Sequence, residues 1–149
     1  MFVLFVLGGC SGQISEIKPK AESGVFDLRQ VQLGNDIVAL DGQWEFYWNQ
    51  LLPPGETDAG ALTGYVRIPS SWNKSIGTED QLGYGYATYR LQLITAEKAK
   101  LALKIPRMFT AYELWVNGEM VATAGKVGKA RESMTPQYLP QVALFDSQE

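Results

Sequence analysis

The sequence predicts an all-β domain, and three observations support this class. Apolar and polar residues alternate with a period of two in several short segments, as in strands buried on one face. Fifteen glycines and seven prolines punctuate the 149 residues, which is typical of strands joined by turns. No helical periodicity persists for the roughly eleven residues of an average helix. With 46% apolar and 19% charged residues, the composition indicates one globular domain.

The amino terminus predicts an export segment. The stretch MFVLFVLGGCSG opens with seven apolar residues, whereas a membrane-spanning helix needs about twenty. Residues 1–10 fit the end of a signal peptide, although no Lys or Arg precedes the apolar run and the run is short. Residues 7–10 resemble a bacterial lipobox, in which Cys10 would be lipidated. The alternatives are a truncated or misassigned start at Met1, or a buried strand with an ordinary cysteine.

The remaining chain divides into a linker and one domain. Residues 11–23 are polar and contain one proline, which is typical of a linker. Residues 24–149 are expected to form a β-sandwich. The final stretch PQVALFDSQE begins an apolar alternation with no strand after it. Because unpaired strands leave backbone groups exposed, we expect the sandwich to be cut short at its carboxy-terminal end.

The clearest single strand is LDGQWEFYWNQ, residues 40–50, which follows a weaker alternation around Val25 and Leu28. In this stretch Trp44, Phe46 and Trp48 alternate with polar residues, so one face is aromatic. Burying such side chains contributes about 1.5–3 kcal/mol each. We therefore expect the three rings to fill a core, with an aromatic ligand platform as the alternative. Tyr47 lies on the opposite face and is expected to be freer.

Three further strands follow in the middle of the chain. The first is short and ends before Pro69, the second is YATYRLQLI, and the third ends before Pro106. In the second strand, the alternation places the apolar residues on one face and the polar residues on the other. The inward residues are expected to be Ala87, Tyr89, Leu91 and Leu93 in the second strand and Leu101, Leu103 and Ile105 in the third.

The segment ELWVNGEMVATAG predicts a tight β-hairpin. Two β-rich runs meet across Asn117-Gly118, the dipeptide that supplies positive φ at both centres of a type I′ turn. Trp115 is out of phase with Leu114 and Val116, so these residues occupy different faces of the strand. Packing in the core or within the hairpin is the expected role of Trp115.

The composition excludes several chemistries. The sequence contains no histidine and a single cysteine, so Ser-His-Asp and Cys-His catalysis, histidine zinc sites and internal disulfides cannot occur within it. A formal charge of −3 without clustered cations argues against nucleic acid as a partner. No carboxylate pair is assignable to a glycosidase mechanism. Calcium could bind to acidic oxygens, and the acidic residues considered are Asp27, Asp36, Glu79 and Asp80. Their spacing is not that of an EF-hand. No metal or cofactor is therefore expected.

Four blocks in order resemble a known domain. They are LDGQWEF at 40–46, IPSSW at 68–72, GYATYR at 85–90 and LWVNGE at 114–119. This series is similar to the sugar-binding jelly-roll domain that begins the β-galactosidase and β-glucuronidase family. The resemblance implies a galactose-binding-like jelly roll.

A second resemblance covers most of residues 25–142. The blocks LDGQWEFYWNQLL, GYGYATYRL and AYELWVNGEMVATAGKVG, followed by Pro-x-Tyr-x-Pro at 136–140, resemble the extracytoplasmic domain of bacterial receptors with seven transmembrane helices and diverse intracellular signalling modules. This family also implies the jelly roll. Its members continue through further strands into membrane helices and a kinase, cyclase or phosphatase output, none of which this sequence contains.

Four residues are candidates for ligand binding: Trp72, Tyr84, Tyr86 and Arg90. Trp72 and Tyr84 lie in loop-like sequence, whereas Tyr86 and Arg90 share the polar face of their strand. A flat ring and a guanidinium could together hold a sugar or a carboxylate. Plain solvent exposure is the alternative for a polar strand face. The basic stretch GKVGKARE is expected to be a solvated loop.

The expected function is non-catalytic ligand sensing on the periplasmic side of a bacterial membrane, within a longer receptor. The membrane would be reached through the amino terminus or through a transmembrane region beyond the present carboxy terminus. The ligand is expected to be a small molecule such as a sugar or a carboxylate. An accessory sugar-binding domain of a secreted glycoside hydrolase is the alternative, and a lipid-anchored interaction protein is a third class.

Overall fold

The computed structural model describes residues 18–31, 37–54, 60–70 and 84–148. Its regular structure is almost entirely β, which confirms the predicted class. Within these ranges the helical element is one short 3₁₀ turn. The elements are β1 (Val25–Asp27), β2 (Gly42–Trp48), β3 (Gly64–Ile68), β4 (Ala87–Arg90), β5 (Gln92–Ile94), β6 (Lys100–Ile105), β7 (Tyr112–Val116), β8 (Glu119–Ala124), η2 (Arg131–Ser133) and β9 (Gln141–Asp146).

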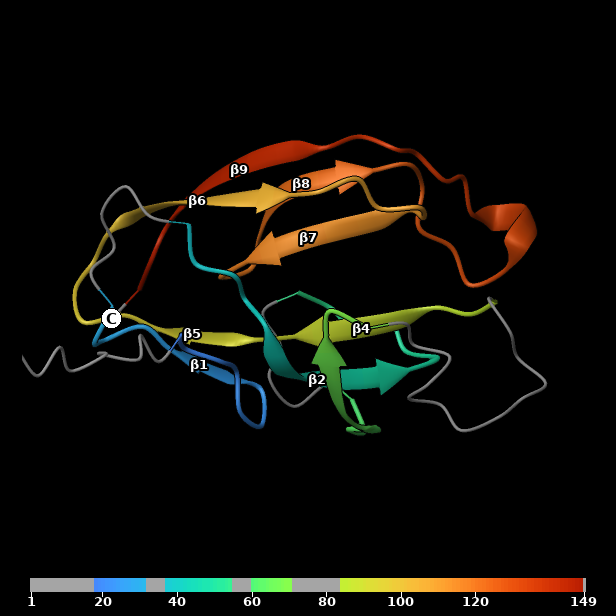
Figure 1. The fold of residues 1–149 in the computed structure, drawn as a ribbon. Coiled ribbons are helices and arrows are strands. Elements are labelled where there is room, and N and C mark those ends of the chain that lie inside the picture. Colours follow the sequence, from blue (N-terminus) through green and yellow to red (C-terminus); the bar gives the residue numbers. More distant parts are fainter. Residues whose placement is uncertain (1–17, 32–36, 55–59, 71–83, 149) are drawn as a thin grey trace, which may run out of the picture.

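The strands lie in two layers that face each other (Figure 1). In the first layer β3, β2 and β4 pair antiparallel in that order, and β1 pairs in parallel with β5. In the second layer β6 pairs with β9 and β7 pairs with β8, both antiparallel. The Gln141 side chain at the start of β9 donates to the Thr123 carbonyl of β8 at 2.8 Å, which joins the two pairs.

Each layer buries its own hydrophobic cluster. In the first layer Ala21, Phe26 and Leu28 are buried, and Trp44 and Leu93 are among the half-buried residues packed against them. In the second layer the buried residues are Ile105, Ala122 and Ala143. The short strands predicted to end before Pro69 and before Pro106 are confirmed as β3 and β6, and the carboxy-terminal alternation forms β9.

The aromatic face of β2 packs as the sequence predicts. Phe46 is 2% exposed, and its ring lies 5.1 Å from that of Tyr89 and 6.0 Å from that of Trp48, measured between centroids. The Trp44 indole packs against the first cluster and donates its N–H to the Leu40 carbonyl at 2.9 Å. These rings therefore contribute to the core of the first layer.

The opposite face of β2 is covered around Glu45 and Tyr47, so the prediction that Tyr47 is freer is wrong: Tyr47 is 3% exposed. At one end of this face the chain turns at Gly24, where an added Cβ would lie 2.6 Å from the Cγ of Glu45. At the other end the Thr88 hydroxyl, level with Tyr47, donates to a carbonyl of residues 50–52 and accepts an N–H from them, at 2.8 and 3.1 Å. Two distant segments thus cover a face that the alternation alone marks as open.

Residues 20–22, at the end of the predicted linker, run beside the start of β2. Ala21 is 2% exposed, its N–H donates to the Asp41 carbonyl at 2.7 Å, and its carbonyl accepts from the Gln43 N–H at 2.8 Å. A turn with φ of +47° at Ser23 and +79° at Gly24 then leads into β1. The packed part of the chain therefore includes these residues. Residues 1–17, with the predicted export segment and Cys10, lie outside the described ranges.

The predicted hairpin is confirmed. Asn117 and Gly118 have φ of +51° and +85°, and Val116 pairs with Glu119 directly across them. The pairing register shifts between Leu114 and Trp115, where Val121 of β8 is the additional residue between the partners Met120 and Ala122. Trp115 is 37% exposed. It is therefore outside the buried core, and of the two roles expected for it packing within the hairpin remains.

Candidate ligand-binding site

Of the four residues predicted to bind a ligand, the structure describes three, and Tyr84 and Arg90 among them have separate contacts. Trp72 lies outside the described residues. Tyr84 and Tyr86 precede β4, with Tyr84 65% exposed and Tyr86 half-buried. Arg90 ends β4, and four residues of extended chain place it about 13 Å from Tyr86. The binding role assigned to these residues stays a prediction, and the contacts of Tyr84 and Arg90 define what each could do.

Tyr84 is paired with the basic loop of the second layer. The Arg131 guanidinium carbon lies 5.6 Å from the centroid of the Tyr84 ring, and the Arg131 Nη1 donates to the Tyr84 hydroxyl at 3.5 Å. Both side chains are exposed, and an exposed cation–π contact contributes about 0.5–1 kcal/mol. This contact joins the approach to β4 with η2, so one face of the Tyr84 ring has a structural partner.

Arg90 is held on the covered face of β2. Its Nε donates to Glu45 Oε2 at 2.5 Å, and its guanidinium carbon lies 5.3 Å from the centroid of the Tyr47 ring. The Tyr47 hydroxyl donates to the same Glu45 oxygen at 2.9 Å. The hydrogen bond to Glu45 raises the pKa of Arg90, and burial, followed by the bond to Glu45, raises the pKa of Tyr47. A ligand carboxylate at Arg90 would compete with Glu45.

This arrangement predicts a stability role for Arg90. Arg90→Gln should lower the free energy of unfolding by about 1–2 kcal/mol, because the Glu45 carboxylate, with a side chain only 19% exposed, loses its charged partner. Arg29→Gln is the matched control, since Arg29 pairs with Asp27 where the two side chains are 59% and 45% exposed. Urea denaturation should show a clear loss for Arg90→Gln and a smaller one for Arg29→Gln. Equal losses would contradict a structural role for the Glu45–Arg90 pair.

A cleft opens between the two layers beside β5. Its volume is about 450 Å³, within the usual range of ligand pockets. One wall is formed by residues 91–95 of the first layer. The other is formed by Trp115, Val116 and Asn117 at the tip of the β7–β8 hairpin and by the end of β9. Trp115 places a large indole at the cleft, and the rest of the lining consists of the Phe145 ring, aliphatic side chains and neutral polar groups.

The polar groups of the cleft are neutral amides and hydroxyls. No charged side chain is among the described residues that line it. The Ser147 hydroxyl accepts from Thr95 Oγ1 at 3.2 Å and from the Ala99 N–H at 3.0 Å, which ties β9 to the chain that follows β5. The Asn117 amide donates to the Asp146 carbonyl at 3.4 Å. The wall on this side of the cleft is thus fixed by hydrogen bonds.

The sequence carried only one signal for this cleft, the out-of-phase position of Trp115. The alternation could not show that β5 and the hairpin tip would face each other across the layers, because that contact joins segments about twenty residues apart. Nor could it show the shift in register between Leu114 and Trp115, since such shifts follow from pairing and not from local pattern. The cleft contains none of the residues predicted to bind a ligand and is therefore a second candidate region.

Neither metal-binding groups nor known relatives indicate a function for the described residues. The described residues include no group of three or more His, Cys, Asp or Glu side chains that could hold a metal ion. Asp27 accepts hydrogen bonds from Arg29, which lower the pKa of Asp27 to about 2. Asp36, Glu79 and Asp80 lie outside the described ranges. None of the described residues forms a helix with the length and hydropathy of a membrane span. Comparison with protein-family models, curated proteins and solved structures finds no match.

Proposed function

We propose that this chain is a non-catalytic ligand-sensing module on the periplasmic side of a bacterial membrane, and that its ligand is a neutral small molecule of the sugar class. The observation that carries the proposal is the cleft of about 450 Å³ with Trp115 in its wall. A partly exposed indole beside amides and hydroxyls suits a ligand with both apolar faces and hydroxyl groups.

The charges near the cleft select among the ligands considered. Sugar and carboxylate were both compatible with the sequence, but a carboxylate needs a cation or several aligned donors to replace its hydration. The described residues that line the cleft include no cation. Nor do those described lining residues include a carboxylate that could act as a general acid, and the whole sequence contains no histidine. Binding without turnover therefore fits the cleft better than catalysis does.

The finer fold and the cellular setting belong to the same proposal. A galactose-binding-like jelly roll fits two facing layers of mainly antiparallel strands. The resemblance to extracytoplasmic receptor domains supports a place within a longer membrane-bound signalling protein, exported by the apolar amino terminus with lipidation at Cys10. The alternative is an accessory sugar-binding domain of a secreted glycoside hydrolase. Sequence downstream of this chain would separate the two, because a receptor requires several apolar stretches of about twenty residues.

The experiment measures neutral sugars against the wild-type chain and two variants. Galactose, glucose and mannose are titrated calorimetrically, with thermal midpoints recorded in parallel, since a ligand that binds only the folded state raises the midpoint. Trp115→Ala should weaken the binding of the sugar that binds best by about tenfold or more. Its midpoint without ligand should stay within a few degrees, because Trp115 is partly exposed.

Phe109→Ala is the control, since Phe109 is 80% exposed and does not line the cleft. It should leave sugar binding unchanged. If none of the three sugars binds to the wild-type chain, or if Trp115→Ala binds as tightly as Phe109→Ala, the cleft is not a sugar site and the proposal fails.

A further inference from the structure

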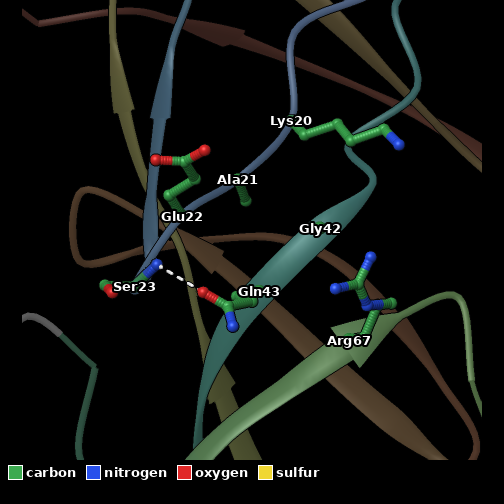
Figure 2. A pocket seen from close by; sticks show the side chains of 7 residues that line it. All are labelled: Lys20, Ala21, Glu22, Ser23, Gly42, Gln43 and Arg67. Carbon is green, nitrogen blue, oxygen red and sulfur yellow. Dashed lines mark hydrogen bonds between the residues drawn. The ribbon is translucent and has the colours of Figure 1, made fainter.

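A second pocket lies in the first layer, where residues 20–23 run beside β2. Its volume is about 320 Å³. Figure 2 shows the seven residues that line it, drawn from the approach to β1, the start of β2 and β3. They are Lys20, Ala21, Glu22, Ser23, Gly42, Gln43 and Arg67. Unlike the cleft at Trp115, this pocket is mainly polar and contains two cations.

The floor of the pocket is bare backbone held in place by close packing. Gly42 has φ of +123°, and an added Cβ would lie 2.4 Å from both the N and the O of Ala21. The hydrogen bonds of Ala21 to Asp41 and Gln43 fix the two chain segments against each other. The backbone positions from which the surrounding side chains project are therefore fixed by packing.

The polar side chains around the floor are arranged by strand pairing. Gln43 and Arg67 are direct partners in the antiparallel register of β2 and β3, so they project from the same face at a Cβ separation of about 5 Å. The Gln43 Oε1 accepts the Ser23 N–H at 3.3 Å, which leaves the amide nitrogen of Gln43 as a donor. In Figure 2 the charged ends of Lys20 and Arg67 lie to one side of Gly42 and the Glu22 carboxylate to the other.

The two cations of the pocket differ from the two arginines that form ion pairs within the described residues. Arg29 and Arg90 form ion pairs with acidic residues of the chain, whereas the described residues provide no ion-pair partner for Lys20 or Arg67. With Glu22 counted, the pocket lining carries one excess positive charge in a chain whose net charge is −3. A guanidinium fork, an ammonium and an amide donor around this floor form a complementary set for a carboxylate.

We propose that this pocket binds the carboxylate of a small organic acid, with Arg67 as the bidentate donor and Lys20 as a supporting charge. This site is separate from the proposed sugar cleft and does not depend on it. It would give the module two ligand classes, a neutral one between the layers and an anionic one on the first layer. Because Lys20 and Arg67 are exposed, binding should weaken as added salt screens the charges.

The test is calorimetric titration of the full chain with succinate at low ionic strength, with succinamide as the uncharged probe. Arg67→Gln should weaken succinate binding about tenfold, as expected for loss of a charge-assisted hydrogen bond. Lys20→Gln should weaken it a few-fold, because a screened point charge contributes less. Arg107→Gln removes an exposed arginine that does not line the pocket and should leave binding unchanged. Succinamide should not compete.

Two additional measurements keep the result unambiguous. Melting midpoints establish that the variants fold, and Arg67→Lys, which keeps the charge but loses the fork, should bind at an intermediate level if Arg67→Gln is unstable. Trp115→Ala should bind succinate as the wild type does, so failure of the sugar proposal would not affect this one. Absence of succinate binding below about 1 mM, or equal affinity in Arg67→Gln and Arg107→Gln, would overturn the proposal.

Discussion

Phe26→Ala is expected to lower the free energy of unfolding by about 3–5 kcal/mol. Phe26 is 0% exposed and lies in the cluster with Ala21 and Leu28, against which Trp44 packs. Removing the ring loses its transfer free energy and leaves a cavity that a rigid strand cannot fill. Because a domain of this size is stable by only about 5–15 kcal/mol in total, the variant should approach the limit of folding.

The measurement is urea denaturation followed by tryptophan fluorescence, since Trp44 adjoins the expected cavity. Phe109→Ala is the matched control, because it makes the same chemical change at a ring that is 80% exposed. It should change the unfolding midpoint little. A comparable loss in both variants would mean that the Phe26 cluster is not the core of the first layer.

The importance of Phe26 could not be predicted from the alternation. β1 has only three residues, so its period-two pattern is too short to stand out around Val25. In contrast β2 has seven residues and a complete aromatic face, and the Asn117-Gly118 turn has a local requirement for positive φ. Features set by local pattern were therefore predictable, whereas those set by long-range packing were not.

The binding candidates show the same division. The polar face of the strand that contains Arg90 was predicted correctly, since Arg90 is paired with Glu45 on the polar face of β2. Its accessibility could not be deduced, because the turn at Gly24 and residues 50–52 cover that face from far along the sequence. Both pockets likewise arise where distant segments meet. A single sequence indicates residue types and strand faces, but it does not show which faces other segments leave open.

The contact between residues 20–22 and β2 can be tested directly at Gly42. Gly42→Ala should lower the free energy of unfolding by about 2–6 kcal/mol, from backbone strain at positive φ together with overlap of the new Cβ and the Ala21 backbone. The φ of Gly42 is +123°, and the overlapping atoms would be 2.4 Å apart. Neither atom belongs to a flexible side chain, so relief would require residues 20–22 to move away from β2.

Gly118→Ala separates the two causes. Gly118 also has positive φ, +85°, but an added Cβ there would have no atom within 4 Å. This variant should therefore show only the strain, about 1–2 kcal/mol. Denaturation curves of the two variants give the difference, which contains the packing of residues 20–22 on β2 and the greater strain at the φ of Gly42. Since Gly42 and Ala21 also form the floor of the pocket at Arg67, Gly42→Ala should lose succinate binding while Gly118→Ala retains it. Equal destabilisation by the two variants would show that residues 20–22 do not pack against β2 in solution.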